Sequence, residues 1–316
     1  MNRIFYLAKQ ESGNAHLNGK FVPEEKAVIP VTAHALHYGT GCFEGIRAYY
    51  NEEEKALYVF RLEDHFKRMV RSANLLFMKL PGTPKELSKI TTELLQKNFS
   101  DTDIYIRPLA FKIDPAVGNF NLKTLKDGFV IYTVALGRYL KEGGVRANIS
   151  SWMRVPDRAI PPRGKVTGAY VNTAFAKTES LLGGFDEALF LDEKGHVVEG
   201  SAENLFMVRD GRLITPALSD DILVGLTRDT IMTIAKDELG VETVERSIDR
   251  SEIYSADEVF VCGTGAEVTP VIEIDHHPIG EGKTGEVTGQ IKKLYFDIVH
   301  GKNSKYQSWL TKVTKK

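Results

Sequence analysis

The chain has 316 residues, of which 42% are hydrophobic and 26% are charged. This composition is that of a globular protein, and a chain of this length forms roughly two domains of ~100–200 residues each. A formal net charge of −1 leaves no basic excess to neutralise phosphates, which argues against nucleic acid as a general partner. Cys42 and Cys262 lie far apart and give neither a metal motif nor a disulfide framework. We therefore expect a reducing, cytoplasmic compartment.

The ends and apolar runs of the chain indicate no membrane segment. The first residues lack the long apolar run of a signal peptide. The longest apolar stretch, residues 129–137, is about half of the ~20 residues that a membrane helix needs, so we expect a buried strand there.

The N-terminal part of the chain is predicted to be an α+β domain, residues 1–136. After two strand-like segments near residues 50 and 60, apolar residues at helical spacing predict a helix within 61–78. A second helix is expected within 84–99, followed by strands at 105–113 and 128–137. The segment 137–147 has a glycine pair, charges and no periodicity, and we interpret it as an interdomain linker.

The C-terminal part, residues 148–316, is predicted to be a second α+β domain. Its expected elements are a strand at 148–155, a helix at 171–184, three short strands within 187–216, a helix at 226–240 and a strand at 257–263. The turns are placed at Lys194–Gly195 and Asp210–Gly211, and Gly240 ends the second helix. Two α+β domains around a cleft are the predicted architecture. Small-molecule sites are common between domains.

One lysine stands in an unusual context. Lysines are common on exposed helix faces, but Lys165 lies in PPRGKVTGAY, where prolines and glycines disfavour a helix. A phosphate-binding loop requires Ser or Thr after the lysine, and Val166 stands there instead. The GTGAEV segment at 263–268 lacks the third glycine of a dinucleotide fingerprint.

Other chemistries have weaker support. His34 and His37, like the pair at 276–277, bring no carboxylate or cysteine at ligand spacing, so no metal site is predicted. The chain has no G-x-S-x-G motif of a serine hydrolase. A lysine held on constrained backbone suits a Schiff-base amine, because such an amine must be partly desolvated and fixed in place.

If the partner carbonyl is that of pyridoxal phosphate, three further groups are needed: a carboxylate at the ring nitrogen, a phosphate-binding helix start or glycine turn, and a donor near the phenolic oxygen. Glu199, Thr227, the Thr264–Gly265 turn and Tyr170 are the candidates. Each has a structural alternative: a surface strand-end glutamate, a helix N-cap, an ordinary turn and a core tyrosine.

In this order the motifs resemble those of the branched-chain aminotransferases, which belong to the class IV, D-amino-acid aminotransferase-like group of pyridoxal-phosphate enzymes. The resemblance extends from about residue 33 to residue 297. It rests on ALHYGTGCFEGIRAY, VFRLEDH, YIRPL, ISSWMR, GKVTGAYVN, EGSAENLF, LTRDTI and DEVFVCGTGAEVTPV. The resemblance implies the two-domain α+β fold of this group, with pyridoxal 5′-phosphate in the interdomain cleft.

The resemblance also implies roles for individual residues. Lys165 matches the lysine that forms the Schiff base with the cofactor and moves the proton at the substrate Cα. The cofactor-binding positions implied are Arg61 and Thr227 at the phosphate with the Leu226 backbone and Thr264, Glu199 at the ring nitrogen, and Tyr170 near the phenolic oxygen. The substrate-binding positions implied are Tyr38, Phe43, Arg47, Tyr105, Arg107, Tyr139, Thr264 and Gly265.

The implied reaction is transamination between L-leucine, L-isoleucine or L-valine and 2-oxoglutarate by a ping-pong route. An apolar pocket with Arg107 at its edge can accept leucine and also bind the second carboxylate of glutamate. YIRPL and FEGIR favour this L-specific branch, whereas Gly265 and Leu136 depart from the family and leave the order of substrates open. Two alternatives remain: an aminotransferase for D-amino acids or (R)-amines, and a lyase or non-catalytic homologue that binds pyridoxal phosphate.

The resemblance further implies a homodimer or larger homo-oligomer in which Tyr38 comes from the neighbouring subunit. The position of the loop 112–121 before the linker would suit a lid over the substrate. Oligomer size and the metabolic direction of the reaction stay open at this stage.

Overall fold

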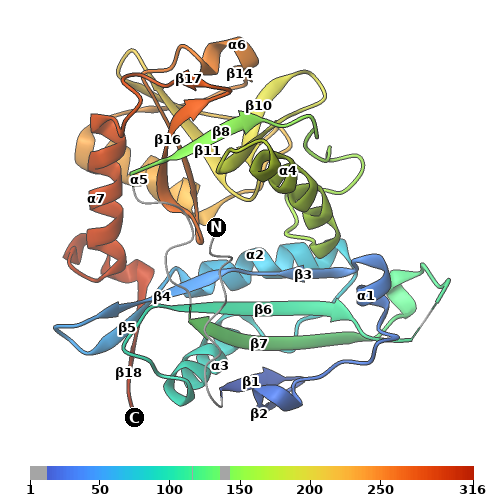
Figure 1. The fold of residues 1–316 in the computed structure, drawn as a ribbon. Coiled ribbons are helices and arrows are strands. Elements are labelled where there is room, and N and C mark those ends of the chain that lie inside the picture. The colour runs from blue at the N-terminus through green and yellow to red at the C-terminus, as the bar shows by residue number, and fades with distance from the viewer. Residues whose placement is uncertain (1–12, 116, 136–142) are drawn as a thin grey trace. The chain divides into compact units, whose positions relative to one another are not determined.

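The computed structural model of the protein describes residues 13–115, 117–135 and 143–316. These residues form two compact units, each built on its own β-sheet (Figure 1). The first unit holds the described residues up to 135, residues 164–168 and residues 297–316. The second unit holds residues 143–163 and 169–296.

The first unit contains an eight-stranded sheet in the order β18-β5-β4-β6-β7-β1-β2, with β3 paired to β6. All its pairings are antiparallel, and β6 and β7 pair along nine residues each. The strands are β1 Asn14–Leu17, β2 Lys20–Pro23, β3 Gly41–Phe43, β4 Ile46–Asn51, β5 Ala56–Phe60, β6 Ile104–Lys112, β7 Asp127–Ala135 and β18 Leu310–Thr314.

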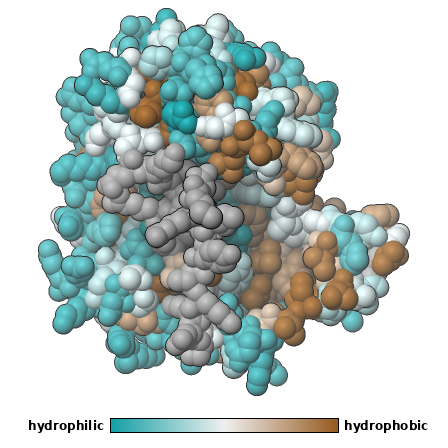
Figure 2. All heavy atoms as spheres, viewed as in Figure 1, coloured by the Kyte–Doolittle hydropathy of each residue, from teal (hydrophilic) through white to brown (hydrophobic). Residues whose placement is uncertain are grey.

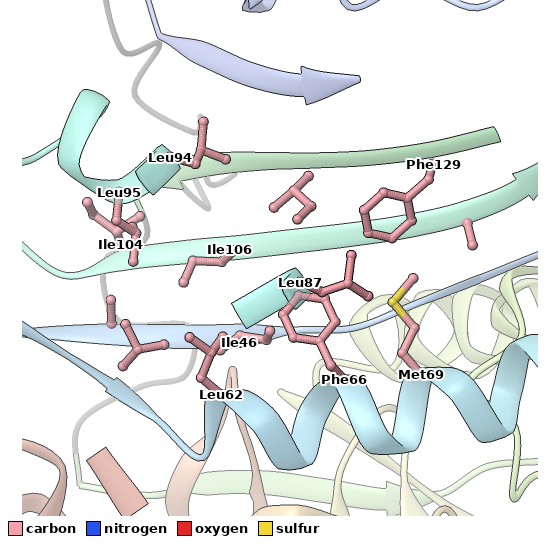
Figure 3. Close-up of a cluster of buried hydrophobic side chains, with 14 of the residues drawn as sticks. Ile46, Leu62, Phe66, Met69, Leu87, Leu94, Leu95, Ile104, Ile106 and Phe129 are labelled. Carbon is pink, nitrogen blue, oxygen red and sulfur yellow. The ribbon is translucent and has the colours of Figure 1, made fainter. Parts of the chain in front are cut away.

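Helices α2 (Leu62–Leu75) and α3 (Pro84–Lys97) supply much of the core of the first unit. Figure 3 shows Leu62, Phe66 and Met69 extending from α2 toward Ile46 and Ile106 on the sheet. These side chains recur every three or four residues, so they form one apolar stripe along the helix. The start of α3 is fixed by a capping box of Thr83 and Glu86 around a proline at the first helical position.

The second unit contains a ten-stranded sheet in the order β13-β12-β11-β15-β16-β8-β9-β10-β14, with β17 paired to β16. An additional pairing of β10 with β11 closes six of these strands into a ring, and its register is the single pair Glu199↔Asn204. The strands are β8 Val145–Ile149, β9 Glu187–Leu191, β10 His196–Gly200, β11 Asn204–Arg209, β12 Arg212–Thr215, β13 Thr243–Glu245, β14 Ile248–Asp249, β15 Glu258–Gly263, β16 Glu267–Ile274 and β17 His277–Pro278.

Three helices belong wholly to the second unit: α4 Tyr170–Leu182, α5 Leu226–Leu239 and α6 Arg250–Ile253. Helix α7, Glu286–Val299, runs to the end of this unit, and its last residues are counted with the first unit. Gly240 ends α5 in the left-handed conformation, as the sequence predicted. In the described part of the chain, every helix is too short or too polar to cross a membrane.

Several predicted elements differ from those observed. The strand expected at 148–155 runs from Val145 to Ile149, because the hydroxyls of Ser150 and Ser151 bond Glu179 and turn the chain out of the sheet. Of the expected linker, 137–147, residues 137–142 lie outside the described part of the chain, and its last residues, 145–147, belong to β8. The segment 187–216 forms four strands instead of three, since a turn at residues 201–203 separates β10 from β11.

The units also draw on different parts of the chain from those that the sequence suggested. Residues 164–168, including Lys165, and residues 297–316 were placed in the domain 148–316. In the structure both segments make their contacts in the first unit, where β18 pairs with β5 and Val166 bridges Cys42. A late strand can return to the first sheet because β5 would otherwise be an exposed edge.

Candidate functional site

The backbone of Lys165 is held on both sides by the first unit. Its N–H donates to the Ser72 hydroxyl at 3.0 Å, and its carbonyl accepts the Phe43 N–H at 3.1 Å. The next residue, Val166, forms an antiparallel bridge with Cys42. The tether of the amine is thus a short piece of backbone fixed to a strand and to helix α2.

The Lys165 amine lies against an aromatic ring that it shares with an arginine. Its Nζ is 5.0 Å from the centre of the Phe43 ring, and the Arg107 guanidinium is 4.3 Å from the same centre. Arg107 also donates to the Tyr105 hydroxyl at 2.8 Å, because the two residues point to one side of β6. Among the described residues, the buried Nε of Arg107 has no hydrogen-bond partner. The structure thus brings together Phe43, Tyr105, Arg107 and Lys165.

A buried ion cluster lies next to this group in sequence. Glu44 is fully buried and accepts from His65 Nδ1 at 2.8 Å and from Arg68 at 2.8 and 2.7 Å. Burial by itself raises the pKa of Glu44, but the charge and hydrogen bonds of Arg68 and the hydrogen bond of His65 lower it to about 2. Burial, with the nearby charges of Arg68 and Lys165, lowers the pKa of His65 although the Glu44 carboxylate raises it.

Arg61 stands at the N-cap of α2 in the left-handed conformation, with φ of 48°. This conformation is uncommon for a residue with a Cβ and is found at functional positions more often than elsewhere. Its N–H donates to the Trp309 carbonyl at 2.7 Å, and its Nε pairs with Asp64 at 3.0 Å. Strand β18 and the turn before it therefore fix the position from which Arg61 projects.

Two of the predicted substrate residues, Arg47 and Tyr38, lie in other settings. The Arg47 guanidinium is buried and pairs with Asp103 at 3.0 Å, so a carboxylate of the protein holds its charge. Tyr38 ends the short helix α1, His34–Tyr38, and its ring packs on His34 and Phe120 at 4.5 and 5.0 Å. Tyr139, like Leu136 at the departure noted above, lies outside the described residues. Roles for Arg47, Tyr38 and Tyr139 in substrate binding stay predictions.

In the second unit, Glu199 is fixed by three donors. Its Oε1 accepts from Asn204 Nδ2 and from the Leu223 N–H, both at 2.8 Å, and its Oε2 pairs with Arg154 at 2.9 Å. Only 4% of the residue is exposed. The alternative of a surface strand-end glutamate is therefore wrong, because the side chain is buried at the pair that closes the strand ring.

The start of helix α5 lies against the same asparagine. Gly225 is the N-cap of α5, and a Cβ built on it would be 1.9 Å from Asn204 Oδ1. Asn204 Nδ2 also donates to the Leu223 carbonyl at 2.9 Å, so one side chain joins Glu199 to the turn before the helix. Leu226 and the buried Thr227 follow at the first two helical positions. A helix of 14 residues presents partial positive charge at this end.

Two further predicted positions adjoin these strands. Thr264 and Gly265 follow β15 directly, and β15 pairs with β11 through Asn204↔Cys262. Tyr170 is the first residue of α4, whose Thr173 donates to the Ser201 carbonyl at 2.7 Å, just after β10. Strand pairing and this contact therefore link the elements that carry Tyr170, Glu199, Thr227 and Thr264.

Several residues of this region were not predicted from the sequence. Glu203 is buried within the EGSAENLF segment, and burial, followed by the charge of Glu187, raises its pKa to about 8. Asn204 and Arg154 hold Glu199, and Glu44 lies beside Phe43. Glu44, Glu203 and Asn204 stand in motifs already singled out. The sequence of those motifs does not distinguish a residue that contacts a ligand from a residue that holds it in place.

The chain is similar to known proteins over most of its length. Residues 41–274 match the family of class IV amino-transferases. Over 304 residues the chain is 47% identical to a probable branched-chain-amino-acid aminotransferase of Aquifex aeolicus, covering 95% of this chain and 96% of the relative. It is 38% identical over 300 residues to the branched-chain-amino-acid aminotransferase of Escherichia coli K12, with 94% and 96% covered.

Solved structures give the same result. The branched-chain aminotransferase of Thermoproteus uzoniensis with norvaline aligns with a TM-score of 0.92 at 45% identity, covering 96% of this chain and 99% of that one. The branched-chain amino acid aminotransferase of T.th., complexed with N-(5′-phosphopyridoxyl)-L-glutamate, aligns with a TM-score of 0.90 at 44% identity, covering 95% and 98%. The chain belongs to the branched-chain-amino-acid aminotransferases of the class IV aminotransferase family. The predicted family and α+β fold are confirmed.

Proposed function

We propose that this protein transfers the amino group of L-leucine, L-isoleucine or L-valine to 2-oxoglutarate, using pyridoxal 5′-phosphate bound through Lys165. The observation that carries the proposal is the anchored lysine: its backbone is bonded at both N–H and C=O, and its amine lies against Phe43. Similar proteins support the cofactor, since the Thermobaculum terrenum enzyme was solved in a PLP-form and the T.th. enzyme with pyridoxamine 5′-phosphate.

The residues present fit the chemical groups of this cofactor. Glu199 offers a buried carboxylate for the ring nitrogen, and Arg154 and Asn204 fix its orientation. A phosphate suits the N-terminus of α5, where the N-cap is a glycine and Thr227 is the second helical residue. Among the described residues, the buried Ser201 hydroxyl, just after β10, has no hydrogen-bond partner, as expected of a group placed for a ligand.

Other groups complete the proposed cofactor contacts. Arg61 supplies a cation for the phosphate, and its left-handed backbone sets the direction of its side chain. The Leu226 backbone and Thr264 lie at the start of a helix and the end of a strand, where N–H groups bind anions. Tyr170 is assigned to the phenolic oxygen.

The chain's own residues perform the proton transfers of the reaction. When bound, pyridoxal 5′-phosphate serves as the electron sink for charge that develops at the substrate Cα. The Lys165 amine takes the proton from that Cα and returns it on the product side, acting as base and then as acid. The fixed backbone of Lys165 restricts the positions that the amine can reach, which favours one face of the substrate.

One pocket must accept both leucine and glutamate. The Phe43 ring gives an apolar wall for the branched side chain, and Arg107 can bind the γ-carboxylate with charge-assisted hydrogen bonds. Tyr105, already bonded to Arg107, orients the guanidinium and contributes to α-carboxylate binding together with the Thr264–Gly265 turn. Tyr38, Arg47 and Tyr139 remain assigned to substrate binding on the resemblance.

The assembly and compartment belong to the same proposal. On the face shown in Figure 2, apolar side chains gather over α1 and the segment 117–121. The exposed apolar residues of these two segments include Leu36, Val117 and Phe120. We assign this surface, which carries Tyr38, to contact between subunits of a homodimer or larger homo-oligomer. The cytoplasm is the assigned compartment because both cysteines are free and buried.

The test is a spectral titration of the purified protein with L-leucine and then with D-alanine. We expect L-leucine alone to convert the bound cofactor from its aldehyde-derived form to its amine form, and the absorption spectrum reports this conversion. Conversion by D-alanine alone would favour the D-amino-acid alternative, and a bound cofactor that neither amino acid converts would favour a lyase or non-catalytic protein. Lys165→Ala is expected to abolish turnover, so near-normal rates of this variant would contradict the assigned mechanism.

A further inference from the structure

Helix α2 carries a polar stripe beside its apolar one. His65, Arg68 and Ser72 recur at intervals of three and four residues, so they lie on one side of the helix. All three are buried, with 2%, 7% and 0% of their surface exposed. The proposed reaction gives none of them a role, although burying an ion pair costs free energy unless its hydrogen bonds are complete.

The contacts of this stripe form a closed circuit through Lys165. Ser72 donates to the Arg68 carbonyl at 3.2 Å and accepts the Lys165 N–H at 3.0 Å. The Lys165 carbonyl accepts the Phe43 N–H at 3.1 Å, and Phe43 is covalently followed by Glu44. The circuit closes where the Arg68 guanidinium donates to both oxygens of Glu44.

The geometry of the ion pair in this circuit holds its two partners in a fixed arrangement. Arg68 binds Glu44 through Nε and a terminal nitrogen, a two-point arrangement that fixes the angle between the groups as well as their distance. His65 adds a third donor to the same carboxylate at 2.8 Å. The pair therefore fixes the distance between α2 and the strand end at Phe43, which are the two anchors of Lys165.

We propose that Glu44 is a positioning residue for Lys165: with Arg68 and His65, it sets the spacing of the Ser72 and Phe43 anchors and so the position of the amine. The inference rests on the proposed function of Lys165. A substitution at Glu44 should loosen the Lys165 backbone without removing any group that touches substrate. The loss should appear in kcat, because an amine that samples more positions reaches the substrate proton less often.

The test uses Glu44→Gln, which keeps the shape and removes the charge, together with Ser72→Ala and the double variant. Amide hydrogen exchange is measured by mass spectrometry on peptides containing Lys165 and Phe43. The kcat, calculated per bound cofactor, and the KM for L-leucine are measured for the same variants. We expect exchange of the Lys165 amide to rise about 10-fold in each single variant, and kcat to fall about 10-fold with KM within about 2-fold of the wild-type value. The double variant should differ little from either single one.

Asp127→Asn is the matched control. Asp127 pairs with the buried Lys112 at 2.7 Å in the same unit, but neither residue belongs to the circuit. This variant should lower stability while leaving Lys165 exchange and kcat unchanged. A purely structural role for Glu44 predicts the same result for Glu44→Gln as for the control, and that result would overturn the proposal. A double variant whose effect equals the product of the effects of the two single variants would also overturn it.

Two further outcomes are distinguished by design. If Glu44→Gln does not fold, Ser72→Ala decides: exchange must rise at Phe43 as well as at Lys165, and a rise at Lys165 alone contradicts the circuit. Borohydride reduction of the wild-type holoenzyme, followed by peptide mapping, shows separately whether Lys165 carries the cofactor. Failure of that labelling refutes the proposed function, whereas labelling with unchanged exchange in the variants refutes only the positioning role.

Discussion

Gly225 is a glycine at which a single methyl group should disturb the proposed cofactor region. A Cβ there would be 1.9 Å from Asn204 Oδ1, 3.1 Å from its Cγ and 3.3 Å from the Cβ of Arg228. Ordinary contact needs about 3.4 Å, so the Asn204 amide would have to move by roughly 1.5 Å, the difference from 1.9 Å. Asn204 is 6% exposed, which leaves it little room for that movement.

The displacement breaks two hydrogen bonds of Asn204 Nδ2, to Glu199 at 2.8 Å and to the Leu223 carbonyl at 2.9 Å. A bond to a charged group contributes ~1.5–3 kcal/mol and one between neutral groups ~0.5–1.5 kcal/mol. Gly225→Ala should therefore lower the free energy of unfolding by about 2–4.5 kcal/mol. Because Glu199 and the start of α5 lose their common support, the affinity for pyridoxal 5′-phosphate should fall as well.

Urea denaturation of the cofactor-free protein gives the change in stability, and fluorescence titration with pyridoxal 5′-phosphate gives the affinity. Gly289→Ala is the matched control, because Gly289 lies in α7 with no atom within 4 Å of a built Cβ. The control should be neutral or more stable by up to ~1 kcal/mol. A Gly225→Ala protein with wild-type stability and affinity would refute the reasoning, since Asn204 would then not be held where the structure has it.

Three other predictions follow from the buried charges. Glu199→Gln should retain the cofactor but lose most of kcat, measured with L-leucine and 2-oxoglutarate, because the ring nitrogen would lose its anionic partner; an unchanged kcat would remove Glu199 from this role. Asp127→Asn should lower the free energy of unfolding by about 2–3 kcal/mol in urea, since Lys112, 0% exposed, would lose its carboxylate; a loss below ~0.5 kcal/mol would contradict this. The pKa of Glu203 is raised to about 8 from its ordinary value of 4.5, so the folded state binds a proton more tightly than the unfolded state. The contribution of this proton to the free energy of unfolding is therefore full below pH 4.5 and is lost as the pH rises through 8. Glu203→Gln should therefore stabilise the protein more at about pH 9 than at about pH 5 in paired urea titrations, and an equal effect at both would disprove the shift.

Local sequence patterns were sufficient to predict α2, α3, α4 and α5, whereas α1, α6 and α7 were not predicted. The apolar spacing of α2 and the glycine after α5 identify those elements from a few neighbouring residues, and the capping box fixes the start of α3. Motif order was sufficient to predict the family. The turn at residues 201–203 was missed because it contains no glycine or proline, and strand β18 was missed because its pairing with β5 spans most of the chain.

The support of the site was beyond the reach of the sequence for a different reason. EGSAENLF contains two glutamates, and the structure gives them opposite environments: Glu199 is paired with Arg154, while Glu203 is buried with its pKa raised. That difference depends on an arginine 45 residues away from Glu199 in the sequence (199 − 154). Likewise Glu44 and Arg68 look like ordinary charges on a turn and on a helix, and only the fold brings them into contact with each other. A motif therefore indicates which residues meet the ligand, whereas the residues that hold them in place become recognisable only when strands and helices from distant parts of the chain are brought into contact.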